Sequence, residues 1–190
     1  MLSLFQNRSD LPIRMQLDMK YRNARVSLLL VVAFTFINMV MRVSQVSSYW
    51  LFSANIPFFL TDLGMYFGGM YANPTEGMIE SGFGSLGVDF FYGMLAVSIL
   101  IVGGYFLAWL MSANGHIGWM IGALVAFALD TVFVLVTPIF DLYGINVDFV
   151  FDLLLHAYVL YALVDGILAR RRYLALPPDA PIYDTQDSEA

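Results

Sequence analysis

The sequence predicts an all-α integral membrane protein, a four-helix transmembrane bundle with a re-entrant or interfacial hairpin on its outer side. Three observations predict this fold. Hydrophobic residues make up 59% of the 190-residue chain and charged residues only 13%, whereas soluble domains carry about 25% charged residues. Four apolar runs have the length of a membrane crossing, and basic residues gather near both ends of the chain. A soluble chain this short could not bury so much apolar surface, so lipid must be its solvent.

The four apolar runs cover about residues 26–46, 90–111, 117–138 and 149–169. Each run is close to the ~20 residues that a helix needs to cross a hydrocarbon core of ~30 Å. We expect all four to be helical, because lipid offers no hydrogen-bond partners to open backbone groups. They define a transmembrane domain over residues 26–169.

The basic residues predict the orientation of the bundle. Five precede the first span and three follow the fourth: Arg8, Arg14, Lys20, Arg22, Arg25, and Arg170, Arg171, Arg172. Only Arg42 lies between these two groups. Because positive charges stay on the cytoplasmic side, we expect both termini there and an even number of crossings. The expected location is the plasma (inner) membrane.

A further apolar segment, about residues 51–71, does not fit this count. A fifth crossing would place the three C-terminal arginines outside. Pro57, Gly64, Gly68 and Gly69 also predict a poor straight helix. We therefore interpret the segment as a re-entrant or interfacial hairpin on the outer side, packed against protein. The alternative is a true crossing, with the charge rule broken or another span misread.

The two ends of the chain have different compositions. Residues 1–25 form a basic cytoplasmic arm, either an interfacial helix or a loose tail. A cleaved signal peptide is disfavoured, because the charged region is long and no small-residue cleavage site follows. Residues 170–190 form a cytoplasmic tail whose proline-rich, acidic composition predicts disorder.

Polar residues inside the spans predict a cluster in the outer leaflet. Ionisable groups within a span are costly and need partners, so each one is a candidate functional residue. At 1.5 Å per residue, the candidates fall in two adjoining layers about 5–12 Å from the outer ends of their spans. We expect a binding or proton-linked cluster of Asn38, Arg42, Ser98, Asp130, Asp152 and His156.

The third span carries small residues at every fourth position: Gly118, Gly122 and Ala126, followed by Asp130. Stripes of small residues mark close approach between membrane helices. We expect this stripe to pack on the fourth span and to bring Asp130 against His156. Asp165 lies near the inner interface beside Arg170 and Arg171, where a structural ion pair is expected.

The composition limits the chemistry. The chain has no cysteine and a net charge of −6, which excludes disulfides and thiolate sites and argues against nucleic acid as a partner. Asp130, Asp152 and His156 could in principle hold zinc. No metal-binding motif or second intramembrane histidine supports such a site, so we expect neither a metal nor another cofactor.

Two interpretations of the cluster stay open. It is either a buried network that fixes helix register or a functional polar cavity. The first function hypothesis is binding or movement of a small solute or ion, coupled to protons. The second is an accessory subunit or assembly factor for another membrane protein, and the third is a metal-dependent membrane-embedded hydrolase. A non-enzymatic role is favoured and catalytic residues are unknown. The expected partners are the lipid bilayer and either further copies of the chain or another membrane protein.

Overall fold

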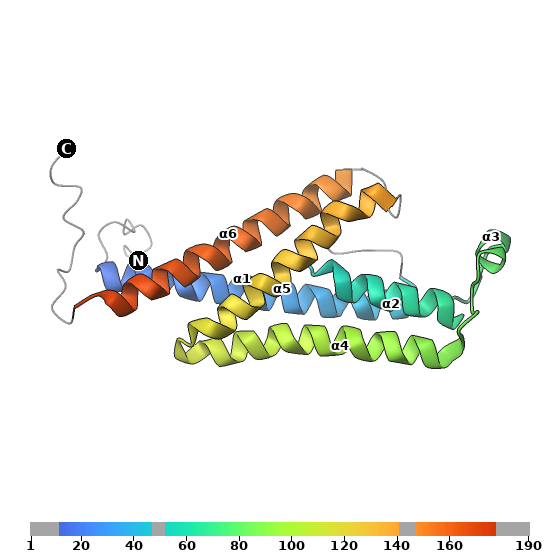
Figure 1. Ribbon diagram of the computed structural model, residues 1–190, viewed down its shortest axis with the longest axis horizontal. Helices are drawn as coiled ribbons and strands as arrows, with labels where there is room; N and C mark the ends of the chain where they lie inside the picture. The colour runs from blue at the N-terminus through green and yellow to red at the C-terminus, as the bar shows by residue number, and fades with distance from the viewer. Residues whose placement is uncertain (1–11, 47–51, 141–146, 178–190) are drawn as a thin grey trace, which may run out of the picture.

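The computed structural model describes residues 12–46, 52–140 and 147–177, and these described residues contain helices but no strands. Four helices are long and apolar enough to cross a membrane. They are α1 (Ile13–Val43), α4 (Gly87–Met111, continued by the short helix η2, Ser112–Asn114), α5 (Ile117–Val136) and α6 (Val147–Ala175) (Figure 1). The predicted fold class, an all-α membrane bundle, is therefore confirmed.

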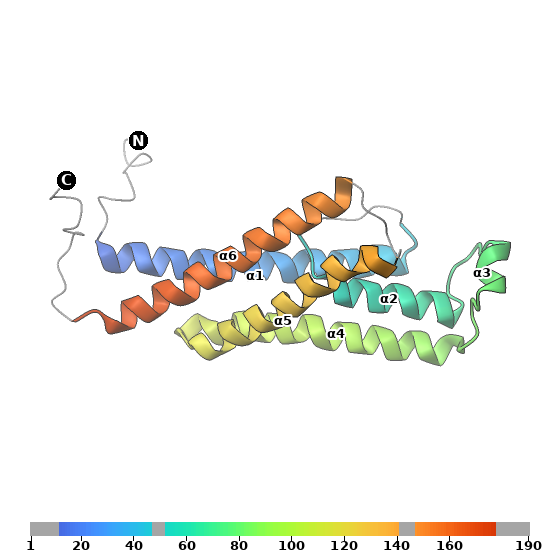
Figure 2. The same cartoon turned by 45° about the horizontal axis from the view of Figure 1, so that its top comes forward.

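The bundle is elongated. The start of α1 and the end of α6 lie at one end, which we call the terminal end, and the short helix α3 (Glu76–Glu80) lies at the other, the α3 end (Figures 1 and 2). α1 and α4 run along the long axis, while α5 and α6 cross them at an angle (Figure 2). α1 packs most extensively on α6. The outer surfaces of α4, α5 and α6 expose many Leu, Val and Phe side chains, as expected of helices that face lipid.

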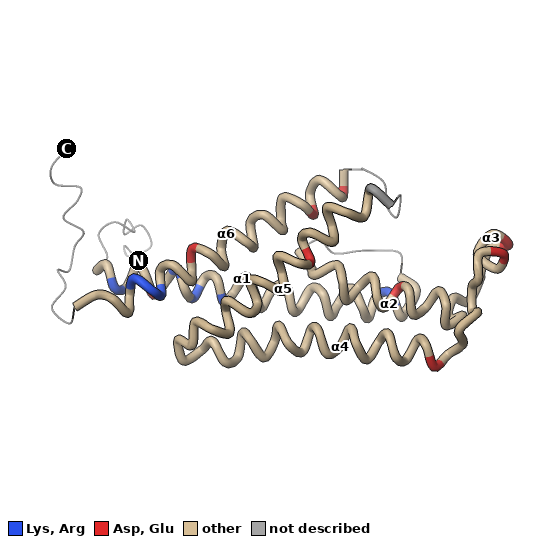
Figure 3. Tube along the Cα trace, in the orientation of Figure 1, with Lys and Arg blue, Asp and Glu red and all other residues tan. Residues whose placement is uncertain are grey.

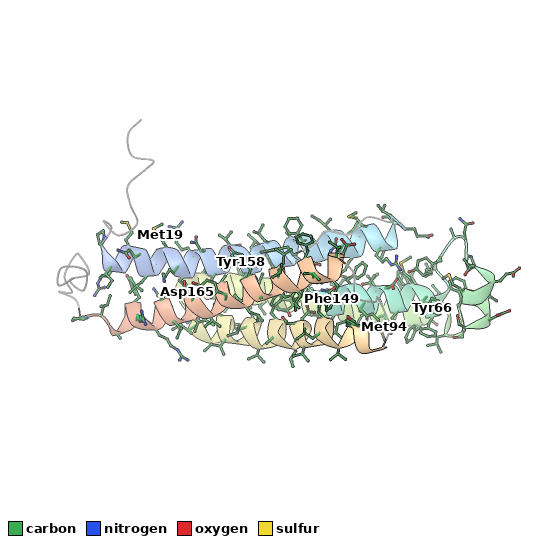
Figure 4. The ribbon with its side chains drawn as sticks, turned by 90° about the horizontal axis from the view of Figure 1, so that it is seen from above. Met19, Tyr66, Met94, Phe149, Tyr158 and Asp165 are labelled. Carbon is green, nitrogen blue, oxygen red and sulfur yellow. The ribbon has the colours of Figure 1, made fainter. Side chains whose placement is uncertain are left out.

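The contact between α1 and α6 depends on a glycine that the sequence interpretation did not single out. A Cβ atom added at Gly166 would lie 2.3 Å from the Cβ of Ala24, so only glycine permits this approach. One residue earlier, Asp165 pairs with Lys20 of α1 at 3.1 Å. Figure 4 shows Asp165 where α6 runs beside α1. The expected ion pair is present, but its partner is Lys20 and not Arg170 or Arg171.

The segment after α1 forms a short helix, α2 (Asn55–Gly68), which begins inside the bundle and runs toward the α3 end beside α4. Its 14 residues extend about 21 Å, too short to cross a membrane. The described part of this segment is thus a single short helix, and its re-entrant or interfacial placement stays a prediction; residues 47–51 lie outside the described residues. Pro57 does not interrupt α2, because it falls in the first turn, where a missing N–H costs nothing.

Two glycines of α2 make its contact with α4. A Cβ at Gly64 would lie 2.9 Å from Met94 Cβ, and one at Gly68 would lie 2.7 Å from Phe91 Cβ. These glycines, four residues apart, let the two backbones approach closely. Gly69 then ends the helix in the left-handed conformation, with φ of 72°.

The predicted packing stripe on α5 was wrong. Gly118, Gly122 and Ala126 are exposed, and a Cβ added at either glycine would meet nothing within 4 Å. The reason is geometric: a step of four residues turns about 40° beyond a full helical turn, so the stripe winds away from the buried face. Only its last member, Asp130, lies among the buried residues, beside Phe127 and Val134.

The ends of the chain are more helical than expected. α1 already begins at Ile13, so the described part of the predicted 1–25 arm belongs to the first long helix. α6 continues to Ala175, so residues 170–175 are not a disordered tail. The rest of both predicted end segments, residues 1–11 and 178–190, lies outside the described residues.

Candidate functional site

The polar residues of the bundle gather around the N-terminus of α2. A helix that begins inside an apolar core has N–H groups that its own backbone cannot satisfy. In α2 these groups belong to Ala54, Asn55 and Ile56, because Pro57 has no N–H. Side chains from α1 and α5 accept all three hydrogen bonds.

Asp130 of α5 accepts two of these bonds. Its Oδ2 lies 2.9 Å from the backbone N of Asn55, and its Oδ1 lies 2.7 Å from the backbone N of Ile56. Asp130 is only 1% exposed. A carboxylate at this position satisfies the N–H groups and also meets the partial positive charge of the helix end. Asp130 thus acts as the capping side chain of α2, but from a different helix.

α1 holds the residues that lead into α2. The Thr35 hydroxyl accepts the Ala54 N–H at 2.7 Å and donates to the Val31 carbonyl at 2.6 Å. One turn further along, the Asn38 amide donates to Ser53 Oγ at 2.9 Å. Ser53 and Ala54 are both fully buried. The backbone of this connection can therefore lie inside the bundle, because α1 supplies its hydrogen-bond partners.

The chain turns into this connection at Phe52. Its φ of 76° lies in the left-handed region, which residues with a side chain rarely adopt. The Phe52 ring packs 6.3 Å from the ring of Phe34 on α1 and 6.1 Å from that of Tyr158 on α6. These two aromatic contacts compensate for the unfavourable backbone conformation.

His156 of α6 connects Asp130 to Asp152. Its Nδ1 lies 2.8 Å from the backbone carbonyl of Asp152, which can only accept, so Nδ1 carries a hydrogen. Its Nε2 lies 3.1 Å from Asp130 Oδ2. One proton lies on this second hydrogen bond, so the Asp130–His156 pair has no net charge whichever group holds that proton. The imidazole stacks on Phe127, with centroids 4.9 Å apart.

Asp152 is the second carboxyl group of this site. Its Oδ2 accepts a hydrogen bond from Asn55 Nδ2 at 2.6 Å. Its Oδ1 is buried 3.4 Å from His156 Nδ1 and has no hydrogen-bond partner among the described residues. A buried carboxylate with an unsatisfied oxygen is costly. We call Asp130, Asp152, His156 and Asn55 the capping cluster.

The structure brings together some of the predicted site residues. His156 contacts both Asp130 and Asp152, so the expected Asp130–His156 contact is present. Asn38 reaches the same region through Ser53. Ser98 is buried, but its hydroxyl donates to Met94 of its own helix at 2.9 Å, so no described bond joins it to the cluster.

Arg42 was wrongly placed in this cluster. Its Nε donates to Asp62 Oδ1 of α2 at 2.5 Å, and Nη2 contacts the same oxygen. The physical reason is the position of α2, which packs beside α1 here and brings its own carboxylate to the guanidinium. Arg42 also lies over the rings of Phe58 and Tyr71.

Four residues of the site were missed by the sequence interpretation: Thr35, Ser53, Asn55 and Asp62. Asp62 could have been found, because it is the only acidic or basic residue in the apolar run 51–71 and such residues need a partner. Pro57 marks the first turn of a helix and so could have drawn attention to Asn55. No pattern in the sequence marks Thr35 or Ser53.

A metal site needs three or more ligating side chains arranged around one point. Among residues 12–46, 52–140 and 147–177, no group of three His, Cys, Asp or Glu side chains is arranged to hold a metal ion. His156 instead contacts Asp130 through one ring nitrogen and Asp152 through the other. Nothing in this geometry supports the hydrolase hypothesis.

The chain has no match among known proteins in three comparisons. No protein-family model matches it, no curated protein matches its sequence, and no solved structure matches its fold.

Proposed function

We propose that this protein binds and moves a small solute or ion across a membrane and couples this to proton uptake at the capping cluster. The observation that carries the proposal is the contact of two carboxyl groups and an imidazole, all buried, at the start of a half-length helix. Ionisable residues inside membrane bundles mark ion pathways and proton relays. Half-length helices that begin inside the bundle contribute substrate and ion sites in many transporters.

The charge of the cluster explains why it would take up a proton. Asp130 and His156 together are neutral, so an ionised Asp152 leaves one uncompensated negative charge. Its side chain is about 10% exposed, and burial of a lone charge is strongly unfavourable. Asp152 relieves this cost by taking up a proton or a small cation next to Asn55.

α2 is the element that would respond to the change in charge. Its N-terminus is held by the carboxylate of Asp130, and the attraction between them depends on that carboxylate remaining ionised. A proton that moves from His156 to Asp130 weakens the hold on α2 and leaves its N–H groups less well satisfied. Proton occupancy would therefore bias α2 between a docked and a released position.

We place both termini on the cytoplasmic side of this pathway. Most Lys and Arg residues lie at the terminal end of the bundle, and several Asp and Glu residues lie toward the α3 end (Figure 3). This distribution supports the orientation through the preference of basic residues for the cytoplasm. The capping cluster would then be reached from the outer side, and we place the protein in the plasma (inner) membrane.

Proton occupancy is tested by infrared difference spectroscopy of the reconstituted full-length protein between acidic and neutral pH. A protonated carboxylic acid in apolar surroundings has its own C=O band, and we expect this band to disappear in Asp152→Asn. Asp165→Asn is the matched control, because Asp165 lies on the same helix but pairs with Lys20 outside the cluster. A wild-type spectrum identical to that of Asp152→Asn would contradict the proposal.

Movement is tested in vesicles that contain a pH-sensitive dye. An inside-negative potential is imposed with and without added NaCl or a mixture of neutral amino acids. We expect wild type and Asp165→Asn to acidify the lumen faster than protein-free vesicles under at least one condition, and Asp152→Asn to match the protein-free vesicles. Equal rates for all samples under every condition would contradict coupled movement.

One observation favours the accessory role as a second candidate. Glycines on α4 and α5 face outward, and a Cβ added at any of them would meet nothing within 4 Å: Gly103, Gly104, Gly118 and Gly122. Such a surface would allow a helix of another membrane protein, or of another copy, to approach closely. Replacement of these glycines by leucine should then disrupt assembly, seen as a lower mass in detergent, without unfolding the chain.

A further inference from the structure

A pocket opens at the α3 end of the molecule, away from the capping cluster. Its volume is about 390 Å³, within the range of pockets that hold small molecules, about 300–1,000 Å³. Figure 4 shows Tyr66, one of its lining residues, toward the α3 end. Side chains of α1, α2 and the segment after α2 line it: Arg42, Gln45, Asp62, Tyr66, Tyr71 and Asn73.

The pocket contains one positive and one negative charge that contact each other. The hydrogen bonds that Asp62 accepts from described residues, from Arg42 and from the hydroxyl of Tyr71, all go to one oxygen, Oδ1. The second oxygen, Oδ2, has no partner among those bonds. Arg42 uses Nε and Nη2 on Asp62, and its guanidinium has five N–H donors in total. Both charged groups therefore keep bonding capacity for a third molecule.

Two of the neutral polar residues of the pocket, Gln45 and Tyr66, are already engaged. The Gln45 side chain donates to the carbonyl of Met70 at 3.1 Å and accepts the N–H of Ala72 at 3.0 Å. Tyr66 donates to the carbonyl of Met78 at 3.1 Å. These bonds shape the wall of the pocket. Recognition of a ligand is left to the two charged groups, whose side chains are 31% and 23% exposed.

We propose that this pocket binds a small zwitterion of the amino-acid type, with its carboxylate on Arg42 and its ammonium group on Asp62. A simple anion would be attracted by Arg42 but repelled by Asp62. A simple cation would be attracted by Asp62 but repelled by Arg42. A molecule with both charges satisfies both groups at once, because a guanidinium pairs well with a carboxylate. The Arg42 guanidinium lies over the Tyr71 ring, 5.2 Å from its centroid, and this cation–π contact helps to hold Arg42 in the pocket.

This inference rests on the proposed function, because it names the class of solute that the protein would move. α2 connects the two sites: Asp62 follows Asn55 by seven residues, or two helical turns and about 10 Å. A ligand bound to Asp62 and a proton bound beside Asn55 therefore act on the same helix. Phe58 lies between the two sites on α2, and the Arg42 guanidinium lies 5.9 Å from its ring centroid.

The test is equilibrium binding to the purified full-length protein, measured by calorimetry with leucine and two analogues. Isocaproate is leucine without its ammonium group, and isopentylamine is leucine without its carboxylate. We expect leucine to bind, with glycine weaker because it fills less of the pocket, and each single-charge analogue to bind at least about tenfold more weakly than leucine. Equal binding of leucine and either analogue, or no binding of leucine and glycine, would overturn the inference.

Variants assign the binding to this pocket. Arg42→Gln and Asp62→Asn should each weaken leucine binding about tenfold or more, whereas Arg42→Lys, which keeps the charge, should retain most of it. Because Arg42→Gln and Asp62→Asn break an ion pair, circular dichroism must show that they are folded; Tyr71→Phe, which keeps that pair, is a milder variant and should weaken binding less. Unchanged binding in folded Arg42→Gln and Asp62→Asn would overturn the inference.

The same measurement separates this inference from the proposed function. Asp152→Asn leaves Arg42 and Asp62 intact, so leucine should still bind to it. If leucine binds to wild type but no proton movement occurs in vesicles, the zwitterion site stands and coupled transport fails. If protons move but leucine does not bind, the proposed function stands and the zwitterion site fails.

Discussion

The carboxylate of Asp130 in α5 lies 2.7 Å from the backbone N–H of Ile56 in α2, although 74 residues separate them in the chain. This hydrogen bond and its partner at Asn55 allow a helix to begin in the middle of an apolar bundle. Each of these N–H groups would otherwise be buried without an acceptor, which lipid cannot supply. The start of α2 inside the bundle and the buried carboxylate of Asp130 are therefore two parts of one structure.

Asp130→Ala should destabilise the fold. Two buried N–H groups lose their acceptors, at about 1–3 kcal/mol each, so the free energy of unfolding should fall by about 2–6 kcal/mol. Asp130→Asn keeps one carbonyl oxygen and should have an intermediate effect. The measurement is reversible unfolding in mixed micelles. Asp148→Ala, at an exposed acidic residue of α6, is the control, and an equal effect of the two alanine substitutions would contradict the capping role.

Two buried threonines provide a matched test of the connection before α2. Thr35 accepts the N–H of Ala54, whereas Thr61 only donates to Pro57 of its own helix. Replacement by valine keeps the shape but removes the hydroxyl. Thr35→Val should therefore lower the free energy of unfolding by about 1–3 kcal/mol more than Thr61→Val. Only the first substitution leaves a buried donor, the N–H of Ala54, without its acceptor. The same unfolding assay measures this difference. Equal free energies of unfolding for the two variants would show that Thr35 does not hold the connection.

Glycine substitutions distinguish the observed packing from the one expected from sequence. Gly68→Ala would place a Cβ 2.7 Å from Phe91 Cβ and should cost about 1–3 kcal/mol through overpacking. Gly122→Ala meets nothing within 4 Å and should be neutral or stabilising by up to about 1 kcal/mol, because alanine favours helix. Thermal unfolding of both variants in detergent gives the comparison. If Gly122→Ala lost more stability than Gly68→Ala, the stripe on α5 would be the packing surface after all.

The orientation is tested by labelling of single cysteines in whole cells with an impermeant reagent. The chain has no cysteine of its own, so no background needs to be removed. Exposed positions at opposite ends of the bundle are Glu76 in α3 and Asn114 in η2. Glu76→Cys should be labelled and Asn114→Cys should be labelled only after the cells are broken. The opposite result would invert the proposed topology.

The candidate site was only partly predictable from the sequence. Asp130, Asp152 and His156 could be found because charged residues in apolar runs are conspicuous, and Asp152 and His156 share a helix face through their spacing of four. Arg42 was assigned to the wrong partner, because the sequence does not reveal which carboxylate lies closest. Thr35 and Ser53 could not be found, since buried hydroxyl groups are common in membrane helices and only their neighbours give them a role.

The sequence by itself determined that lipid is the solvent and that four segments have the length and apolarity to cross it. Composition, run length and the placement of arginine and lysine are properties of short windows, and transfer into lipid depends on those windows. The tertiary structure decided where α2 begins and which glycines make contacts. Whether a buried N–H finds an acceptor depends on side chains from α1 and α5 that meet only in space. The same holds for Gly68 and Gly122: both are glycines in helices, but only Gly68 faces another backbone at close range.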